Sequence, residues 1–337
     1  MITQTPEHQD HALRHEPPAV AKAAGIVVGL TLLLSLIFIA FALPAAKSKP
    51  NDVTIGIAGP PPAVAQIQGA LDQNAAGGFA VSTYADQGAL RTAIRNRDVY
   101  GGISIGPQGP TLLTASGASP TIAQMLGQIG AGMAQRSGMP LHTEDLAPLP
   151  AGDPRGVGLA AAALPLALAG LLPGIVLVLA FRNQTWLQIG TLLAFSAVAS
   201  VTITALLQYV FDAIESNFWG VTAGLFLGTT AIGLVVLGLG ALFGRIGIGI
   251  AAAVALLLGN PLSGINSAPE MLPSGWGAVG QLLPQGANAT LLRSTAFFSD
   301  VFPDPRATTA IVVLGCWAVA GVVLIAVAAL RRRRSSA

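Results

Sequence analysis

The sequence predicts an α-helical polytopic membrane protein with six transmembrane helices and a small inserted α/β extracytoplasmic domain. Of its 337 residues, 53% are hydrophobic and 9% are charged, whereas soluble domains usually carry about 25% charged residues. Residues 157–330 contain five apolar runs, and no Lys, Arg, Asp or Glu lies inside any of them. Charge is thus absent from the segments that hydrocarbon would surround, which is typical of membrane-spanning helices.

The N-terminal part predicts a polar tail followed by the first span. Residues 1–22 are polar and contain Pro17 and Pro18, so we expect a cytoplasmic tail. Residues 23–44 form an apolar run that ends at a proline, and about 21 helical residues span roughly 30 Å. A cleaved signal peptide is the alternative, because residues 43–46 resemble a cleavage site, although the run and the preceding tail are long for one.

Residues 47–155 are the polar segment and predict the extracytoplasmic domain. Alternating and helical periodicities give the order β-α-β-α-β-β-α, as in a small α/β or α+β domain. Ser119 and Pro120 are a suitable N-cap and first residue for the last helix, which we expect to reach residue 136. Residues 141–153 are rich in proline and acidic residues and predict a linker back to the membrane. The expected strands are 52–58, 79–84, 99–105 and 111–115, and the other helices are 63–73 and 86–97.

Five further spans complete the predicted membrane domain. They are residues 157–181, 186–210, 218–243, 246–265 and 308–330. Pro165 and Pro173 predict a bend in the first of these, which neighbouring helices must repair. The run that begins at residue 246 meets Asn260-Pro261 after about 14 residues, so it either continues to residue 265 or is a broken, re-entrant segment. Residues 269–298 mix apolar and polar positions and predict an outer amphipathic segment at the membrane surface.

Gly220, Gly224 and Gly228 recur every four residues and predict a flat helix-packing face on span 218–243. Small residues at this spacing let another helix approach closely. The partner helix is either in the same chain or in a second copy.

Basic residues set the expected orientation. With six spans, Arg14, Lys22, Arg182, Arg245 and the basic tail 331–337 fall on one side, and the acidic loop at 212–215 falls on the other. The positive-inside rule then places both termini in the cytoplasm and residues 47–155 outside the cell membrane. The four arginines at 331–334 are expected to bind lipid headgroups rather than nucleic acid.

The sequence offers no catalytic, cofactor or metal site. Cys316 is the single cysteine, so neither an intrachain disulfide nor a thiolate cluster can form. No phosphate-binding loop of the G-x-x-x-x-G-K-[ST] type occurs, and no Ser-His-Asp or Cys-His arrangement is recognisable. We therefore expect a protein that is not an enzyme, with any ATP hydrolysis performed by a partner. A proton-coupled pump is disfavoured because the spans hold no carboxylate or histidine.

Several segments carry a resemblance to a known family. Residues 52–59 resemble its first outer strand, and ALRTAIRNRDVYGGISI (89–105) is similar to its helix–turn–strand segment. ASGASPTIAQMLGQI (115–129) resembles the following helix, and MLPSGW, LLPQGANATLLR and AFF within 260–298 resemble its proline-containing outer segment. This order resembles the ABC type-2 exporter permeases, in the branch of phage-infection-protein-like and drug-resistance membrane proteins.

The resemblance implies a permease subunit that moves an amphiphilic or lipid-like substrate outward. A separate ABC ATPase and a second permease half would be its partners, within the lipid bilayer. Arg182, Asn183 and Gln184 are the candidate ATPase-contact turn, but this turn is much shorter than the coupling helix of such permeases. The family's IP-x-x-F-S pattern is reduced here to Ile105-Gly-Pro107. The alternative is a non-transporting membrane protein whose outer domain binds a partner or a cell-envelope component.

Overall fold

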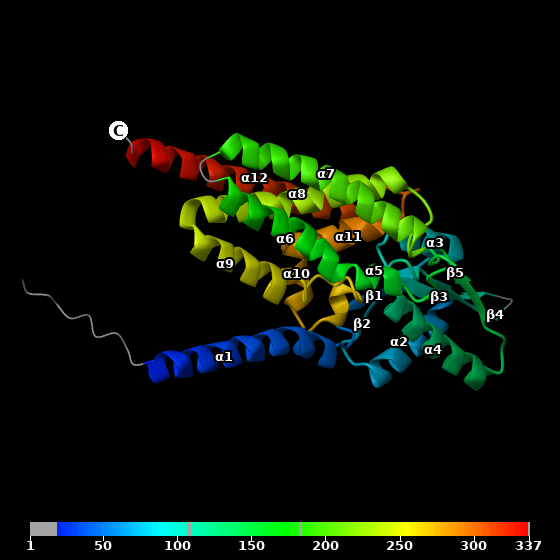
Figure 1. The fold of residues 1–337 in the computed structure, drawn as a ribbon. Helices are drawn as coiled ribbons and strands as arrows, with labels where there is room; N and C mark the ends of the chain where they lie inside the picture. Colours follow the sequence, from blue (N-terminus) through cyan, green and yellow to red (C-terminus); the bar gives the residue numbers. More distant parts are fainter. Residues whose placement is uncertain (1–18, 107–108, 182–183, 336–337) are drawn as a thin grey trace, which may run out of the picture.

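The structure, a computed structural model, describes residues 19–106, 109–181 and 184–335. It is mostly helical, with a small α/β domain at one end of a helical block (Figure 1). Among the described residues, five helices are long and apolar enough to cross a membrane, which supports the prediction of a multi-pass membrane protein. These candidate spans are Val20–Pro44, Val157–Ala180, Thr185–Tyr209, Phe218–Phe243 and Pro305–Arg334.

The predicted span 246–265 is not a full-length helix. It is a shorter apolar helix made of α9 (Arg245–Ala253) and a π-helical turn, η1 (Val254–Gly259). Pro261 has no N–H to continue the ladder, so the helix ends and the chain turns. Of the two alternatives for this run, the structure has the short, broken segment, and the described residues contain five long apolar helices instead of the six predicted spans.

Helix α1 (Ala19–Ala46) lies apart from the other long helices (Figure 1). Its apolar side chains are exposed along its length, and its neighbour in the fold is η1. Because an apolar helix of this length is not stable in water, its surroundings must be lipid or another protein. The helix contains the predicted first span 23–44.

The α/β domain is a five-stranded mixed sheet. The order is β2-β1-β3-β4-β5, in which β3 and β4 form an antiparallel hairpin and the other neighbours are parallel. Its strands are β1 (Val53–Ala58), β2 (Phe79–Tyr84), β3 (Gly101–Gly106), β4 (Gly109–Thr114) and β5 (His142–Asp145). The first four lie within one or two residues of the predicted strands.

The domain contains three helices, α2 (Pro61–Asn74), α3 (Gln87–Arg95) and α4 (Pro120–Ser137), at the positions predicted from the sequence, and they pack against the strands. Asp86 caps α3 by accepting a hydrogen bond from the Ala89 N–H at 2.8 Å. Ser119 caps α4 in the same way, and Pro120 is its first helical residue.

Strand β5 corrects the prediction of a linker at 141–153. His142–Asp145 pairs in parallel with β4 at the edge of the sheet. Its residues are polar and mostly exposed, so the strand has no alternation of apolar residues to reveal it. Pairing with β4, rather than burial of its own side chains, holds it in place.

The helical block is built around α8 (Phe218–Phe243), most of whose residues are buried. Helices α6 (Ala163–Ala180), α7 (Thr185–Tyr209), α11 (Pro284–Phe297) and α12 (Pro305–Ser335) pack against it. The remaining pieces are α5 (Val157–Ala161), the 3-10 turn η2 (Pro269–Met271) and α10 (Trp276–Leu282). Pro165 lies in the first turn of α6, after a break at Ala162, and Pro173 lies inside α6.

The predicted amphipathic surface segment 269–298 is wrong for its second half. Twelve of the 14 residues of α11 are buried, and the helix packs against α8 and α12 instead of lying on a surface. The polar residues Gln281, Asn288 and Arg293 suggested an interfacial helix, but Asn288 and Arg293 lie inside the protein and Gln281 is half-buried. The hydrogen-bond acceptors of Arg293, the Ala118 and Ile265 carbonyls, come from other segments, and the periodicity of the sequence does not reveal them.

The α/β domain and the helical block share one hydrophobic core. Ala268, Met271 and Phe298 belong to the buried cluster that lies under the sheet, and Phe297 and Val301 pack against it. The α/β domain is therefore docked on the helical block rather than tethered to it.

Candidate functional site

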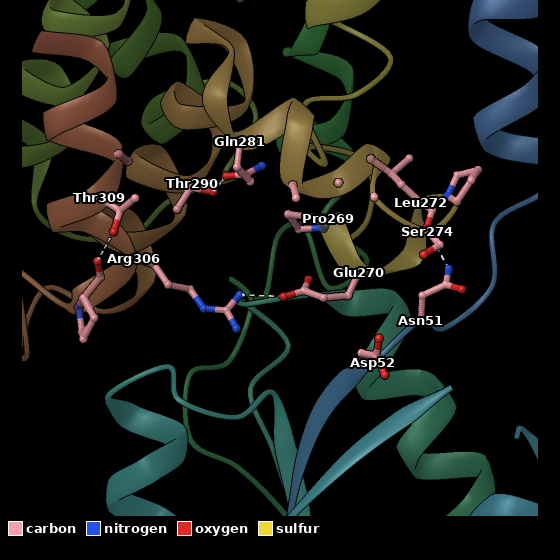
Figure 2. A pocket seen from close by; sticks show the side chains of 16 residues that line it. Asn51, Asp52, Pro269, Glu270, Leu272, Ser274, Gln281, Thr290, Arg306 and Thr309 are labelled. Atoms are coloured by element: carbon pink, nitrogen blue, oxygen red, sulfur yellow. Dashed lines mark hydrogen bonds and ion pairs between the residues drawn. The ribbon is translucent and has the colours of Figure 1, made fainter. Parts of the chain in front are cut away.

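A pocket of about 470 Å³ lies where the α/β domain meets the helical block. Asn51 and Asp52, which immediately precede β1, line it together with residues of the segment 269–275 and of α10, α11 and α12 (Figure 2). The polar groups include Asp52, Glu270 and Arg306, and apolar wall comes from Leu272 and Ala310. The pocket therefore offers charged and apolar surfaces side by side.

Backbone and side-chain hydrogen bonds hold the wall nearest α1. The Asn51 N–H donates to the Glu270 carbonyl at 2.9 Å, and the Asn51 side chain donates to the Leu272 carbonyl at 2.7 Å. The Lys49 N–H donates to the Met271 carbonyl at 3.2 Å. The chain leaving α1 is thus fixed across the segment that carries Glu270.

An ion pair crosses the pocket floor between Glu270 and Arg306, whose charged atoms are 3.4 Å apart (Figure 2). The Tyr100 hydroxyl donates to Glu270 at 2.7 Å and accepts from Arg306 at 2.6 Å. Burial raises the pKa of Tyr100 to about 12, so this hydroxyl stays protonated at neutral pH. The Arg306 guanidinium also lies 4.6 Å from the centre of the Tyr100 ring.

A second, deeper ion pair lies behind this floor. Arg97 and Asp304 are 3.6 Å apart, with side chains 4% and 0% exposed. Arg97 also hydrogen-bonds to the Ser294 hydroxyl and lies 5.0 Å from the Phe298 ring centre. Burial, and then the neighbouring Arg306, lower the pKa of Arg97. This pair joins the α/β domain directly to α11 and α12.

Arg293 joins the same region from α11. It donates to the Ala118 carbonyl at 3.2 Å and to the Ile265 carbonyl at 2.6 Å. Burial lowers its pKa to about 10, which leaves it charged at neutral pH. One buried side chain thereby connects the α/β domain, α11 and the segment that follows the broken helix.

The candidate ATPase-contact turn lies at the other end of the block. Arg182 and Asn183 are outside the described residues. Gln184 is exposed immediately before α7, and it lines a hollow of about 830 Å³ with Trp186 and Arg333. Residues in the first turns of α12 line the pocket at the junction with the α/β domain, whereas residues in its last turns line this hollow. The pocket and the hollow therefore lie at opposite ends of α12.

The three glycines of the predicted packing face have different neighbours. A Cβ on Gly224 would lie 3.3 Å from Leu291, and one on Gly228 would lie 2.2 Å from the Asn288 side chain, both on α11. A Cβ on Gly220 would lie 2.3 Å from the side chain of Asn217, which caps α8 by accepting from the Gly220 N–H. Two of these glycines thus face a helix of the same chain, and the third makes room for a cap.

The residues of the junction were not identified from the sequence. Arg97, Tyr100, Glu270 and Arg306 do not form a motif, and the Arg306–Arg97 hydrogen bond joins positions 209 residues apart. The available signal is the concentration of charge between residues 270 and 306, within and just after the segment predicted to be amphipathic and to lie at the membrane surface.

Comparison with known protein families, with curated proteins and with solved structures finds no match to this chain. Function must therefore be inferred from the residues themselves. Within the described residues there is no group of three His, Cys, Asp or Glu that could hold a metal ion. The pocket instead has the chemistry of a binding site, with an ion pair and amide groups beside an apolar wall.

Proposed function

We propose that this chain is the permease subunit of an ATP-driven exporter of the ABC type-2 class, with its ATPase on a separate chain. It would act with a second permease half and move an amphiphilic or lipid-like substrate outward. The observation that carries this proposal is the pocket at the junction, which combines charged and apolar walls beside the first turns of a membrane-spanning helix.

An amphiphile suits this pocket because of where the polar and apolar surfaces lie. Arg306 and Thr309 are in the first turns of α12, where the chain enters its apolar stretch. At such a position hydrocarbon gives way to headgroups. A polar head would contact Asp52, Glu270 and Arg306, while an acyl chain would lie along Ala278 and Ala310. A volume of about 470 Å³ is within the range of small-molecule sites.

Helix α12 supplies a physical link between the two ends of the block. It contributes to the pocket at one end and to the hollow beside Gln184 at the other. Displacement of its last turns by a bound ATPase would move Arg306 and Thr309 as part of the same helix. In this proposal the turn 182–185 and the end of α12 together contact the ATPase, which compensates for the short turn.

The test is ATP-dependent efflux from vesicles that contain the chain and the ATPase that co-purifies with it in mild detergent. Ala278 is exposed and lines the pocket, so Ala278→Trp fills the site without disturbing the core. We expect it to lower efflux of a fluorescent lysolipid by about tenfold or more, equivalent to ~1.4 kcal/mol of binding.

Val279→Trp is the matched control, because Val279 is 54% exposed on the same helix but does not line the pocket. It should transport normally. Failure of any ATPase to co-purify, or equal efflux by both variants, would contradict the proposal.

A non-transporting role is the alternative, in which the α/β domain binds a partner or a cell-envelope component. The short 182–185 turn favours it. Removing the α/β domain is a poor test, because Phe298 and Arg293 would lose their buried surroundings. Pocket filling discriminates better, since a role in partner binding through the exposed β5 edge would survive Ala278→Trp.

A further inference from the structure

A small, partly open cavity lies behind the pocket, and three arginines line it. Its volume is about 10 Å³, close to the space that one water-sized particle occupies. Arg97 comes from the α/β domain, Arg293 from α11 and Arg306 from α12. Hydroxyl-bearing residues complete much of the wall, namely Tyr100, Ser263, Ser267 and Thr290.

Charge around this cavity is unbalanced. Arg97 pairs with Asp304, and Arg306 pairs with Glu270, but in the described part of the chain no carboxylate lies within ion-pair distance of Arg293. Among the residues that the structure describes, no carboxylate lines the cavity itself. Three guanidinium groups therefore face two carboxylates, and one positive charge is left over in a buried place, which is unfavourable without a counter-charge.

Some N–H donors of the arginines around the cavity also have no hydrogen-bond acceptor. The Nε–H of Arg97 is buried and has no partner, although the residue is only 6% exposed. Arg293 carries five N–H donors, and its hydrogen bonds to the Ala118 and Ile265 carbonyls use two of them. The groups that surround the cavity are thus rich in donors and positive charge, which is the chemistry of an anion site.

We propose that this cavity binds a single halide ion, chloride under physiological conditions. A chloride ion is somewhat larger than water, so the lining side chains must move slightly apart to admit it, whereas phosphate and carboxylate groups need far more room. The surplus positive charge disfavours a metal cation. Water would fit but would leave the surplus charge in place. A chloride ion would contact groups from the α/β domain, α11 and α12 together, so its binding stabilises their docking.

The test is thermal unfolding of the full chain in nanodiscs of zwitterionic lipid, in equal concentrations of sodium chloride, bromide and gluconate. Chloride and bromide should raise the unfolding midpoint by about 3 °C over gluconate when present at tenfold above the dissociation constant. Radioactive chloride should bind to one site per chain. Equal midpoints in the three salts, with no bound chloride, would mean a water-filled cavity and would overturn the proposal.

Two variants tie the effect to this cavity. Arg293→Gln removes the surplus charge and should abolish both the salt-specific shift and chloride binding. Because that variant loses buried contacts, Ser267→Val provides a milder test: Ser267 is half-buried, and added methyl groups fill the cavity. Asn266→Val changes an exposed neighbour outside the cavity and should keep the shift. A folded Ser267→Val protein that still binds chloride would refute the assignment.

Discussion

Replacing Asp304 by asparagine separates two roles of this carboxylate. One oxygen accepts from the Ala307 N–H at 2.8 Å and caps α12, while the other lies 3.6 Å from Arg97. Asparagine keeps an acceptor for the cap but removes the charge. Arg97 then stays buried opposite a neutral amide, and loss of one partner of a buried ion pair costs about 3–5 kcal/mol.

The matched control is Glu144→Gln. Arg91 and Glu144 are also an arginine–carboxylate pair, but their side chains are 36% and 41% exposed. Water solvates both groups when the pair is broken, so the expected loss is below about 1 kcal/mol. The contrast between the two variants isolates the effect of burial.

The assay is amide hydrogen exchange of the full chain in nanodiscs, followed by mass spectrometry of peptides from strand β3 (Gly101–Gly106). Exchange of these buried amides reports the free energy of opening of the α/β domain. The double variant Arg97→Met with Asp304→Asn should recover most of the loss, because the unpaired guanidinium is removed while asparagine keeps an acceptor for the cap of α12. A loss below about 1 kcal/mol for Asp304→Asn, or one equal to that of Glu144→Gln, would refute the reasoning.

Three further variants test other parts of the structure. Gly228→Ala overlaps the Asn288 side chain and should destabilise the block by about 1–3 kcal/mol in detergent unfolding. Gly224→Ala makes a tight contact of 3.3 Å with Leu291, which a small shift of that side chain relieves, so it should cost less. Equal effects would contradict this packing. Asn217→Ala removes the cap of α8 and a 2.8 Å hydrogen bond to the Thr295 carbonyl of α11. It should lower the free energy of unfolding by about 1–2 kcal/mol in the same assay. An unchanged unfolding midpoint would argue against the cap. The raised pKa of Tyr100 predicts that its contribution to stability is intact below pH 10 and is lost between pH 10 and about 12. Tyr100→Phe should remove that part of the decline, measured by unfolding at each pH, and an identical decline in both proteins would exclude it.

Local signals in the sequence predicted most of the regular elements. Asp86 and Ser119 mark helix starts because their side chains cap the first turn, which depends on neighbours a few residues away. The apolar runs predicted the long helices for a similar reason, since hydrocarbon excludes charge from every residue in a span. Such features need no knowledge of the rest of the fold.

The junction depends on distant residues and could not be predicted in this way. The polar residues of α11 are interfacial by pattern, yet Arg293 is buried because carbonyls from two other segments accept its hydrogen bonds. Strand β5 is held by pairing with β4, and its own polar residues do not predict a strand. Contacts between residues so far apart in the sequence leave no periodic pattern of residue types from which they could be predicted.

The core that is shared between the α/β domain and the helical block has a consequence for biosynthesis. The strands of the domain are made early, because chains are synthesised from the N-terminus. Phe298, which completes their hydrophobic packing, and Asp304, which neutralises Arg97, are added near the end. The domain therefore reaches its mature state only after α12 is in place, and a ribosome that stalls before residue 298 would release a chain that quality-control proteases can recognise.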